Sequence, residues 1–131
     1  MKQLATALII GFGLTISLTT PSIAEDMGEI TCGQTLSGEI AAAGEEDNWT
    51  FTASAGDYVR LNVRRMSSSS LLPHVALYGP DGSLIKGADW GISTELSESG
   101  TYVLLVYDGD TGYGDTSRED TGSYSLGFIN L

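Results

Sequence analysis

The chain has 131 residues and carries 17 acidic residues against six lysines and arginines, which gives a formal net charge of −11 at pH 7. Nucleic acids and anionic membrane surfaces would repel such a chain, so the charge argues against both as partners. It favours cations or basic partners, and it also keeps a protein soluble.

A secretory signal peptide is predicted for residues 1–24. Lys2 precedes an apolar run from Leu4 to Leu18, and the small residues Ser22 and Ala24 occupy the −3 and −1 positions of a cleavage site. We therefore expect a secreted or periplasmic protein that begins at residue 25 and has no membrane segment after cleavage. The alternative is an uncleaved anchor, but the apolar run is short for a membrane-spanning helix.

The residues after the signal peptide are enough for one domain. Residues 25–33 are expected to form an N-terminal lead-in to it. This lead-in holds Cys32, the only cysteine of the chain, so no internal disulfide can form. Cys32 is either an inert thiol or a site of pairing between chains.

Residues 34–131 are predicted to form an all-β domain. Apolar and polar residues alternate with the period of two that is typical of strands, and no segment after residue 24 has a sustained helical period. Eight strands are expected, near residues 35–40, 48–53, 58–65, 73–78, 83–86, 92–96, 101–107 and 123–131. We predict an eight-stranded antiparallel β-sandwich of the jelly-roll-like type, in which two sheets enclose one core. The residues expected in that core include Trp49, Phe51, Leu61, Val63, Leu77, Tyr102, Leu104, Val106, Tyr124, Leu126 and Phe128.

The predicted connections alternate between short turns and longer loops. If successive strands run antiparallel, all the longer loops lie at one end of the sandwich, which we call the loop-rich end. Glu45, Glu46, Asp47, residues 67–70, Trp90 and the loop 108–120 would meet there. Loops on a rigid scaffold often carry binding residues, so this end is the first place to look for a site, although long surface loops also occur without function.

The loop 108–120 is the densest cluster of oxygen donors in the chain. Calcium takes six to eight oxygen ligands, and the glycines of this loop let backbone carbonyls turn inward. The loop is therefore a candidate calcium site, and a solvated acidic loop is the alternative. The predicted ligands are Asp108, Asp110, Asp115, Glu119 and Asp120.

Two aromatic residues, Trp90 and Tyr113, are predicted to lie in loops. Together on one rim they would form a stacking platform for sugar rings or a slot for a peptide. The alternative is that they fold back and close the end of the sandwich. They are the candidate ligand-binding residues.

One basic strip is predicted on this acidic protein. Tyr58, Arg60, Asn62 and Arg64 share one face of a strand, opposite to its apolar residues. The strip would either receive the carboxylates of a partner through guanidinium contacts or be neutralised by acidic residues nearby.

The sequence favours a protein that is not an enzyme. His74 is the only histidine, no Gly-x-Ser-x-Gly motif accompanies it, and one histidine with one cysteine makes no zinc site. A carboxylate pair of the kind used in glycoside hydrolysis stays open as an alternative, because the distance between two acids depends on the fold.

The order of several motifs resembles the bacterial pre-peptidase C-terminal domain. These are Gly38, Asp47-x-Trp49-x-Phe51, Ala55-Gly56-Asp57, Gly79-Pro80-Asp81-Gly82, Gly100-Thr101-Tyr102 and Thr121-Gly122-Ser123-Tyr124. The resemblance spans residues 34–131 and implies a secreted β-sandwich of the kind usually attached to extracellular peptidases. It also implies calcium, which some collagen-binding relatives hold. No peptidase precedes the motifs in this chain, so we expect a stand-alone domain.

We therefore expect an exported, non-catalytic binding or accessory module, stabilised by calcium. Its partner would be a periplasmic or extracellular protein or glycan, with a secreted peptidase acting in trans as one candidate. The alternatives are a small secreted hydrolase that uses a carboxylate pair and a structural protein whose copies join through Cys32 or an open sheet edge.

Overall fold

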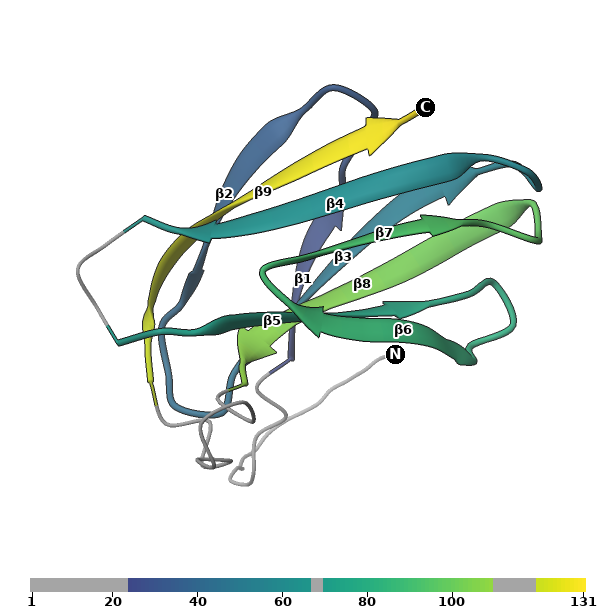
Figure 1. The fold of residues 1–131 in the computed structure, drawn as a ribbon. Coiled ribbons are helices and arrows are strands. Elements are labelled where there is room, and N and C mark those ends of the chain that lie inside the picture. The colour runs from purple at the N-terminus through teal and green to yellow at the C-terminus, as the bar shows by residue number, and fades with distance from the viewer. Residues whose placement is uncertain (1–23, 67–69, 110–119) are drawn as a thin grey trace, which may run out of the picture.

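Nine strands form two facing sheets in a computed structural model of the chain, which describes residues 24–66, 70–109 and 120–131 (Figure 1). The described residues contain no helix, and so none that could span a membrane. The strands are β1 (Ala24–Glu29), β2 (Thr35–Ile40), β3 (Glu46–Ala53), β4 (Tyr58–Arg65), β5 (Pro73–Tyr78), β6 (Leu84–Asp89), β7 (Gly91–Glu95), β8 (Gly100–Asp108) and β9 (Gly122–Asn130).

The two sheets have the order β1-β3-β8-β5-β6 and β2-β9-β4-β7. Without β1, the orders β3-β8-β5-β6 and β2-β9-β4-β7 are those of a jelly roll. The predicted all-β sandwich is therefore confirmed, with nine strands in place of eight.

The additional strand, β1, lies in the predicted lead-in except for Ala24, the last residue of the predicted signal peptide. It pairs with β3 in parallel, with Ala24 opposite Glu46 and Glu25 opposite Asp47, whereas the other strand pairs are antiparallel. Its sequence, AEDMGE, is mostly exposed and has no alternation of apolar and polar residues. Pairing with a neighbour, and not a pattern of its own, makes this segment a strand.

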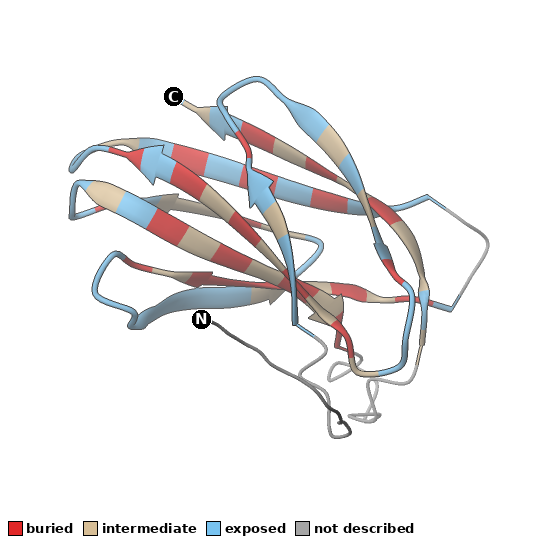
Figure 2. Ribbon diagram, turned by 180° about the vertical axis from the view of Figure 1, so that it is seen from behind, coloured by how far each residue is buried: buried red, intermediate tan, exposed pale blue. Residues whose placement is uncertain are grey.

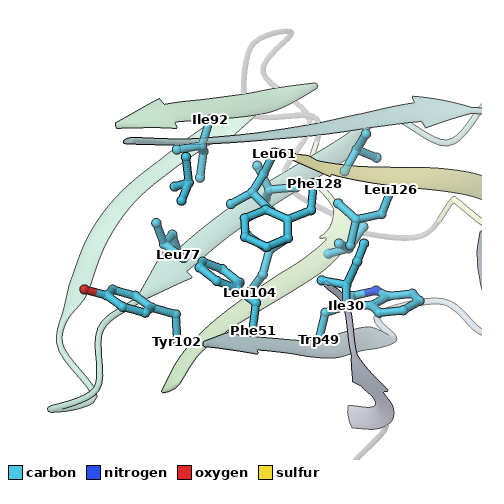
Figure 3. Packing of buried hydrophobic residues seen from close by; sticks show 14 of the residues in the cluster. Ile30, Trp49, Phe51, Leu61, Leu77, Ile92, Tyr102, Leu104, Leu126 and Phe128 are labelled. Carbon is cyan, nitrogen blue, oxygen red and sulfur yellow. The ribbon is translucent and has the colours of Figure 1, made fainter. Parts of the chain in front are cut away.

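The core lies between the sheets, and every core residue predicted above is buried (Figures 2 and 3). Alternation along β3, β4, β8 and β9 places one side of each strand inward. The ring of Phe51 links the two sheets, because it stacks on Tyr102 at 5.3 Å between centroids and packs against Phe128 of the other sheet at 4.6 Å.

The strand register confirms that the connections predicted at the loop-rich end share one end of the sandwich, but the predicted longer loop around Trp90 is wrong, because Trp90 alone separates β6 from β7. The start of β3 pairs with the end of β8, the start of β5 also pairs with the end of β8, and the end of β2 pairs with the start of β9. The connections that follow β2, β4, β6 and β8 therefore leave from the same end of the sandwich.

Candidate functional site

The outer face of the four-stranded sheet is hollowed along β9. The outward residues Ser123, Ser125 and Gly127 of this strand are small, whereas the next outward residue, Ile129, is 41% exposed. Small residues beside the longer side chains of β4 leave a hollow over the strand. Two hollows of about 370 Å³ and 410 Å³ lie there, and we call them together the outer trough. In the second hollow, Sδ of Met66 reaches Oγ of Ser37 at 3.8 Å across β9.

Part of the basic strip on β4 lines the outer trough. Arg60 and Arg64 point outward as predicted. Arg64 lies opposite Ser125 of β9 and lines the first hollow, whereas Arg60 lies opposite Ile129 and lines neither hollow. Neither arginine has a carboxylate within ion-pair distance among the described residues, so the expected neutralisation by nearby acids is not seen there. The adjacent Arg65 differs, since its guanidinium donates to the carbonyl of Leu71 at 3.0 Å.

A chain of buried hydrogen bonds lies on the inner side, where the two sheets meet at the loop-rich end. The indole Nε1 of Trp49 donates to the hydroxyl of Tyr124 at 2.9 Å, and this hydroxyl donates to Oδ2 of Asp47 at 2.6 Å. All three side chains are buried. Gly38 of β2 makes room for them, because a Cβ at this position would lie 2.4 Å from the Tyr124 hydroxyl oxygen.

Next to this chain, two buried carboxylate oxygens have no hydrogen-bond partner among the described residues. They are Oδ1 of Asp47, which is 0% exposed, and Oε2 of Glu45, which is 8% exposed. The other oxygen of Glu45 accepts from the amides of Ala41 and Ala42 at 2.9 and 3.1 Å. Glu25 of β1 completes what we call the acid cluster: each of its three carboxyl groups places an oxygen within 4.8 Å of the other two.

Burial dominates the electrostatics of the acid cluster. The pKa of Asp47 is raised to about 7, mainly by burial and in part by the neighbouring Glu45, and the hydrogen bond from Tyr124 opposes this rise. Burial and the contact with Asp47 also raise the pKa of Tyr124, which keeps its hydroxyl protonated as a donor. Asp47, which is buried beside another carboxyl group, is therefore stabilised by a proton or by a cation close to it.

The acid cluster fits a calcium ion. Oxygens that are each about 2.4 Å from one ion can be no more than about 4.8 Å apart, and the three carboxylates meet this limit. They leave coordination positions for water or backbone carbonyls, as calcium requires. Glu25, Glu45 and Asp47 would hold the calcium that the sequence resemblance implies, and the ion would neutralise their mutual repulsion.

The predicted calcium ligands of the acidic loop are placed only in part. Asp108 is 2% exposed, and its two carboxylate oxygens accept from the amides of Leu72 and Asp120 at 2.9 and 3.2 Å. The carboxylate of Asp120 in turn accepts from the hydroxyl of Ser70. Asp108 therefore ties the β4–β5 connection to the start of β9. The remaining predicted ligands, Asp110, Asp115 and Glu119, lie outside the described residues.

Of the two predicted ligand-binding aromatics, the structure places Trp90 alone, since Tyr113 lies outside the described residues. Trp90 has a φ of 69° and joins β6 of one sheet to β7 of the other. Its amide donates to the carbonyl of Pro73, and its carbonyl accepts from Val63. The side chain is 44% exposed, so it does not close the end of the sandwich as a buried residue would.

His74 and Cys32 both contact other residues of the fold. Nδ1 of His74 lies 2.8 Å from Oδ1 of Asp89, and the imidazole packs against Tyr107 at 5.0 Å between centroids. Cys32 is an exposed free thiol whose sulfur accepts from the amide of Asn130 at 3.2 Å.

The acid cluster as a site was not predicted from the sequence, although Glu45 and Asp47 were placed at the loop-rich end. One signal was available, because Asp47 is in phase with the inward residues Trp49 and Phe51. Glu25 gave no such signal, since it reaches the cluster only through the parallel pairing of β1 with β3.

The described structure defines a small jelly-roll sandwich with a hollowed outer face and an acid cluster in which Glu45 and Asp47 are buried and Glu25 is exposed. No protein-family model matches the chain, and neither does any curated protein sequence. Solved structures do match. PliG from Aeromonas hydrophila, a periplasmic lysozyme inhibitor of g-type lysozyme, is 16% identical with a TM-score of 0.63, over 82% of this chain and 99% of that one.

Two further structures give the same result. PliG from Salmonella Typhimurium is 17% identical with a TM-score of 0.60, over 82% of this chain and 99% of its own. The pre-peptidase C-terminal domain of collagenase from Bacillus anthracis is 17% identical with a TM-score of 0.59, over 85% and 99%. The likeness concerns the fold, and it supports the suspected resemblance to the pre-peptidase C-terminal domain.

Proposed function

We propose that this chain is an exported, non-catalytic module that binds a protein partner through the outer face of its four-stranded sheet. The outer trough carries this proposal, since it is a hollowed surface on a rigid scaffold and its lining includes Arg64, which has no ion-pair partner among the described residues. Such a surface offers both shape and charge to a partner.

The structural neighbours support a binding role. PliG is a periplasmic inhibitor whose target, g-type lysozyme, is a protein, and the other neighbour is the pre-peptidase C-terminal domain of a collagenase. Export is supported by the predicted signal peptide of residues 1–24 and by the periplasmic location of the PliG proteins. Net charge favours a partner that is basic overall.

The test is a binding screen with the processed protein. A g-type lysozyme, a secreted peptidase and unrelated basic proteins of similar size would be titrated by calorimetry, and lysozyme and peptidase rates would be recorded with and without the chain. We expect saturable binding to a partner and no turnover of generic glycoside, ester or peptide substrates. Turnover that Asp47→Asn abolishes would support the alternative, a hydrolase with a carboxylate pair.

We also propose that calcium stabilises the module at the acid cluster. The cluster supports this better than the acidic loop does, because Asp47 and Glu45 keep oxygens without partners whereas both oxygens of Asp108 already accept backbone amides. The loop remains a second candidate through Asp110, Asp115 and Glu119.

A further inference from the structure

We propose that cleavage of the signal peptide after Ala24 creates an internal cation for the acid cluster. This cation is the α-ammonium group of Glu25, and it stabilises the pairing of β1 with β3 in the processed protein. The inference rests on the export that the proposed function includes. It follows from the place of the cleavage site in the fold, the direction of β1 and the unpartnered oxygens of the cluster.

The predicted cleavage site lies inside a strand. Ala24, the last residue of the predicted signal peptide, is the first residue of β1 and pairs with Glu46, and Glu25 pairs with Asp47. Before cleavage the nitrogen of Glu25 belongs to a neutral peptide bond. After cleavage it is an α-amino group, and such groups are mostly protonated at neutral pH. Processing therefore adds one positive charge at the start of β1.

The direction of β1 places this charge at the acid cluster. β1 is parallel to β3, so the two strands begin at the same end (Figure 1). Three consecutive acids, Glu45, Glu46 and Asp47, stand at the beginning of β3. The nitrogen of Glu25 lies on the Glu46 side of its register partner Asp47, and paired strands are about 4.8 Å apart. An antiparallel β1 would have started at the other end of β3, beside Ala53.

The acid cluster has acceptors for such a cation. Oδ1 of Asp47, which is 0% exposed, and Oε2 of Glu45, which is 8% exposed, have no hydrogen-bond partner among the described residues. The carboxylate of Glu25 has an oxygen within 4.8 Å of both groups, so the nitrogen of the same residue is held near them. An ammonium group has three N–H donors, and its hydrogen bonds to carboxylates are stronger than those between neutral groups.

The pairing of β1 is expected to be weaker before cleavage than after it. Proteolysis acts on segments that open locally, so the bond between Ala24 and Glu25 has to leave the sheet before it is cut. β1 suits this requirement, because it is an edge strand whose side chains are mostly exposed. One ammonium group does not balance three carboxylates, so the inference leaves room for calcium and concerns the stability of β1 without it.

Acetylation of the α-amino group tests the inference, because it removes the charge and keeps the chain length. From residue 25 onward the chain contains one lysine, Lys86, so in a Lys86→Arg background the α-amino group is the only amine. Mass spectrometry would verify that the chain starts at Glu25 and carries one acetyl group. Hydrogen exchange of the β1 amides would be measured with a chelator present, so that calcium does not contribute. The β8 amides would report whether each protein is folded.

We expect the β1 amides to exchange about tenfold faster in the acetylated chain than in the chain with a free α-amino group, because opening of β1 no longer breaks the ion pair. In the Glu45→Gln, Asp47→Asn double variant, acetylation should have no such effect. The matched control is the Glu29→Gln, Glu95→Gln double variant. It removes two exposed carboxylates, one at the other end of β1 and one on β7, and should keep the tenfold difference.

Equal exchange of the β1 amides in the free and acetylated chains would overturn the inference, and so would an equal acetylation effect in the Glu45→Gln, Asp47→Asn variant. Either result leaves the proposed function intact, because partner binding and the response to calcium are measured separately. Native protein that begins at a residue other than 25 would also overturn the inference. Native protein that keeps residues 1–24 would remove the proposed export as well.

Discussion

Gly38 occupies a position where a larger residue does not fit. A Cβ there would lie 2.4 Å from the hydroxyl oxygen and 2.5 Å from Cζ of Tyr124. We expect Gly38→Ala to displace this ring and weaken its hydrogen bonds to Trp49 and Asp47, at a cost of about 2–4 kcal/mol in the free energy of unfolding. Urea denaturation measures this loss.

The control for Gly38 is Gly127→Ala on the neighbouring strand. A Cβ at Gly127 would meet Oγ1 of Thr35 at 3.5 Å, an ordinary contact, so this substitution should change the free energy of unfolding by less than about 1 kcal/mol. Equal losses at the two glycines would mean that the close approach to Tyr124 has no energetic role.

The raised pKa of Asp47 predicts how stability changes with pH. In the unfolded chain this carboxyl titrates near its usual 3.8, and in the folded protein near 7. The folded state therefore holds a proton that the unfolded state releases between these values, so this contribution to stability is complete below about pH 4 and is lost as pH rises to 7. The slope is at most about 1.4 kcal/mol per pH unit.

Asp47→Asn isolates this contribution, because the amide keeps the shape and does not titrate. With a chelator present, the difference between wild type and variant should change between pH 4 and 7 and be constant above it. Other acids, such as Asp57 with its lowered pKa, titrate in both proteins and cancel. A difference that does not depend on pH would contradict the raised pKa.

Of the residues of the acid cluster, only Asp47 has a position that could be predicted from the sequence. The alternation Asp47-x-Trp49-x-Phe51 contained the information that Asp47 faces inward, since its neighbours in phase are core residues. That Glu45 and Glu25 join it depends on the turn after β2 and on the parallel pairing of β1. Neither contact leaves a local pattern in the sequence.

At the scale of elements, the strands with alternating burial were predictable and β1 was not. The patterns of β4 and β8 come from the packing of one face, which the period of two records directly. β1 has one partly buried side chain, Met27, and is held by backbone pairing to β3, to which almost any side chain can contribute. Alternation finds strands with one buried face and misses edge strands exposed on both faces.

Asp108 is expected to stabilise the connections at the loop-rich end. Asp108→Ala would leave the partly buried amides of Leu72 and Asp120 without their acceptor, at a cost of up to about 1–3 kcal/mol each. Asp108→Asn, which keeps one acceptor oxygen, should cost less. Thermal unfolding should give the same ranking with calcium and with chelator. A loss of stability that appears only in the presence of calcium would instead support Asp108 as a metal ligand, as predicted from the sequence.

At the scale of the molecule, one strand, β9, contributes residues both to the buried hydrogen-bond chain beside the acid cluster and to the outer trough. β9 contributes Tyr124 to the inner hydrogen-bond chain and Ser123 and Ser125 to the floor of the outer trough, because successive side chains point to opposite sides. A register shift of one residue in this strand would exchange the two sets. The same packing therefore fixes the acid cluster and the binding face.

The contact between the two sheets formed by Phe51 and Phe128 should contribute much of the free energy of unfolding. Phe51→Ala or Phe128→Ala removes a buried ring from the contact between sheets and should cost about 3–5 kcal/mol of unfolding free energy. Because a domain of this size has only about 5–15 kcal/mol in total, either change threatens folding. A loss below about 1 kcal/mol at both positions, measured by urea denaturation, would contradict the observed packing.

Calcium should raise the stability of the whole domain through the acid cluster. An ion that binds only the folded state adds about 2.7 kcal/mol at a free concentration one hundred times its dissociation constant. Because Glu25 belongs to β1 and Asp47 to β3, the ion would hold the N-terminal strand to the five-stranded sheet. The thermal unfolding midpoint of the processed protein should therefore rise with millimolar calcium and fall with chelator.

The proton and the ion compete for the same carboxylates, so the calcium effect should be larger at pH 8 than at pH 5.5. The Glu45→Gln, Asp47→Asn double variant should lose the stabilisation by calcium at both pH 8 and pH 5.5. Glu39→Gln, which removes one carboxylate at an exposed position away from the cluster, should keep the calcium effect. An unchanged midpoint in the wild type, or equal shifts in all three proteins, would exclude the cluster as the calcium site, and loss of the effect in Asp110→Asn would assign the ion to the acidic loop.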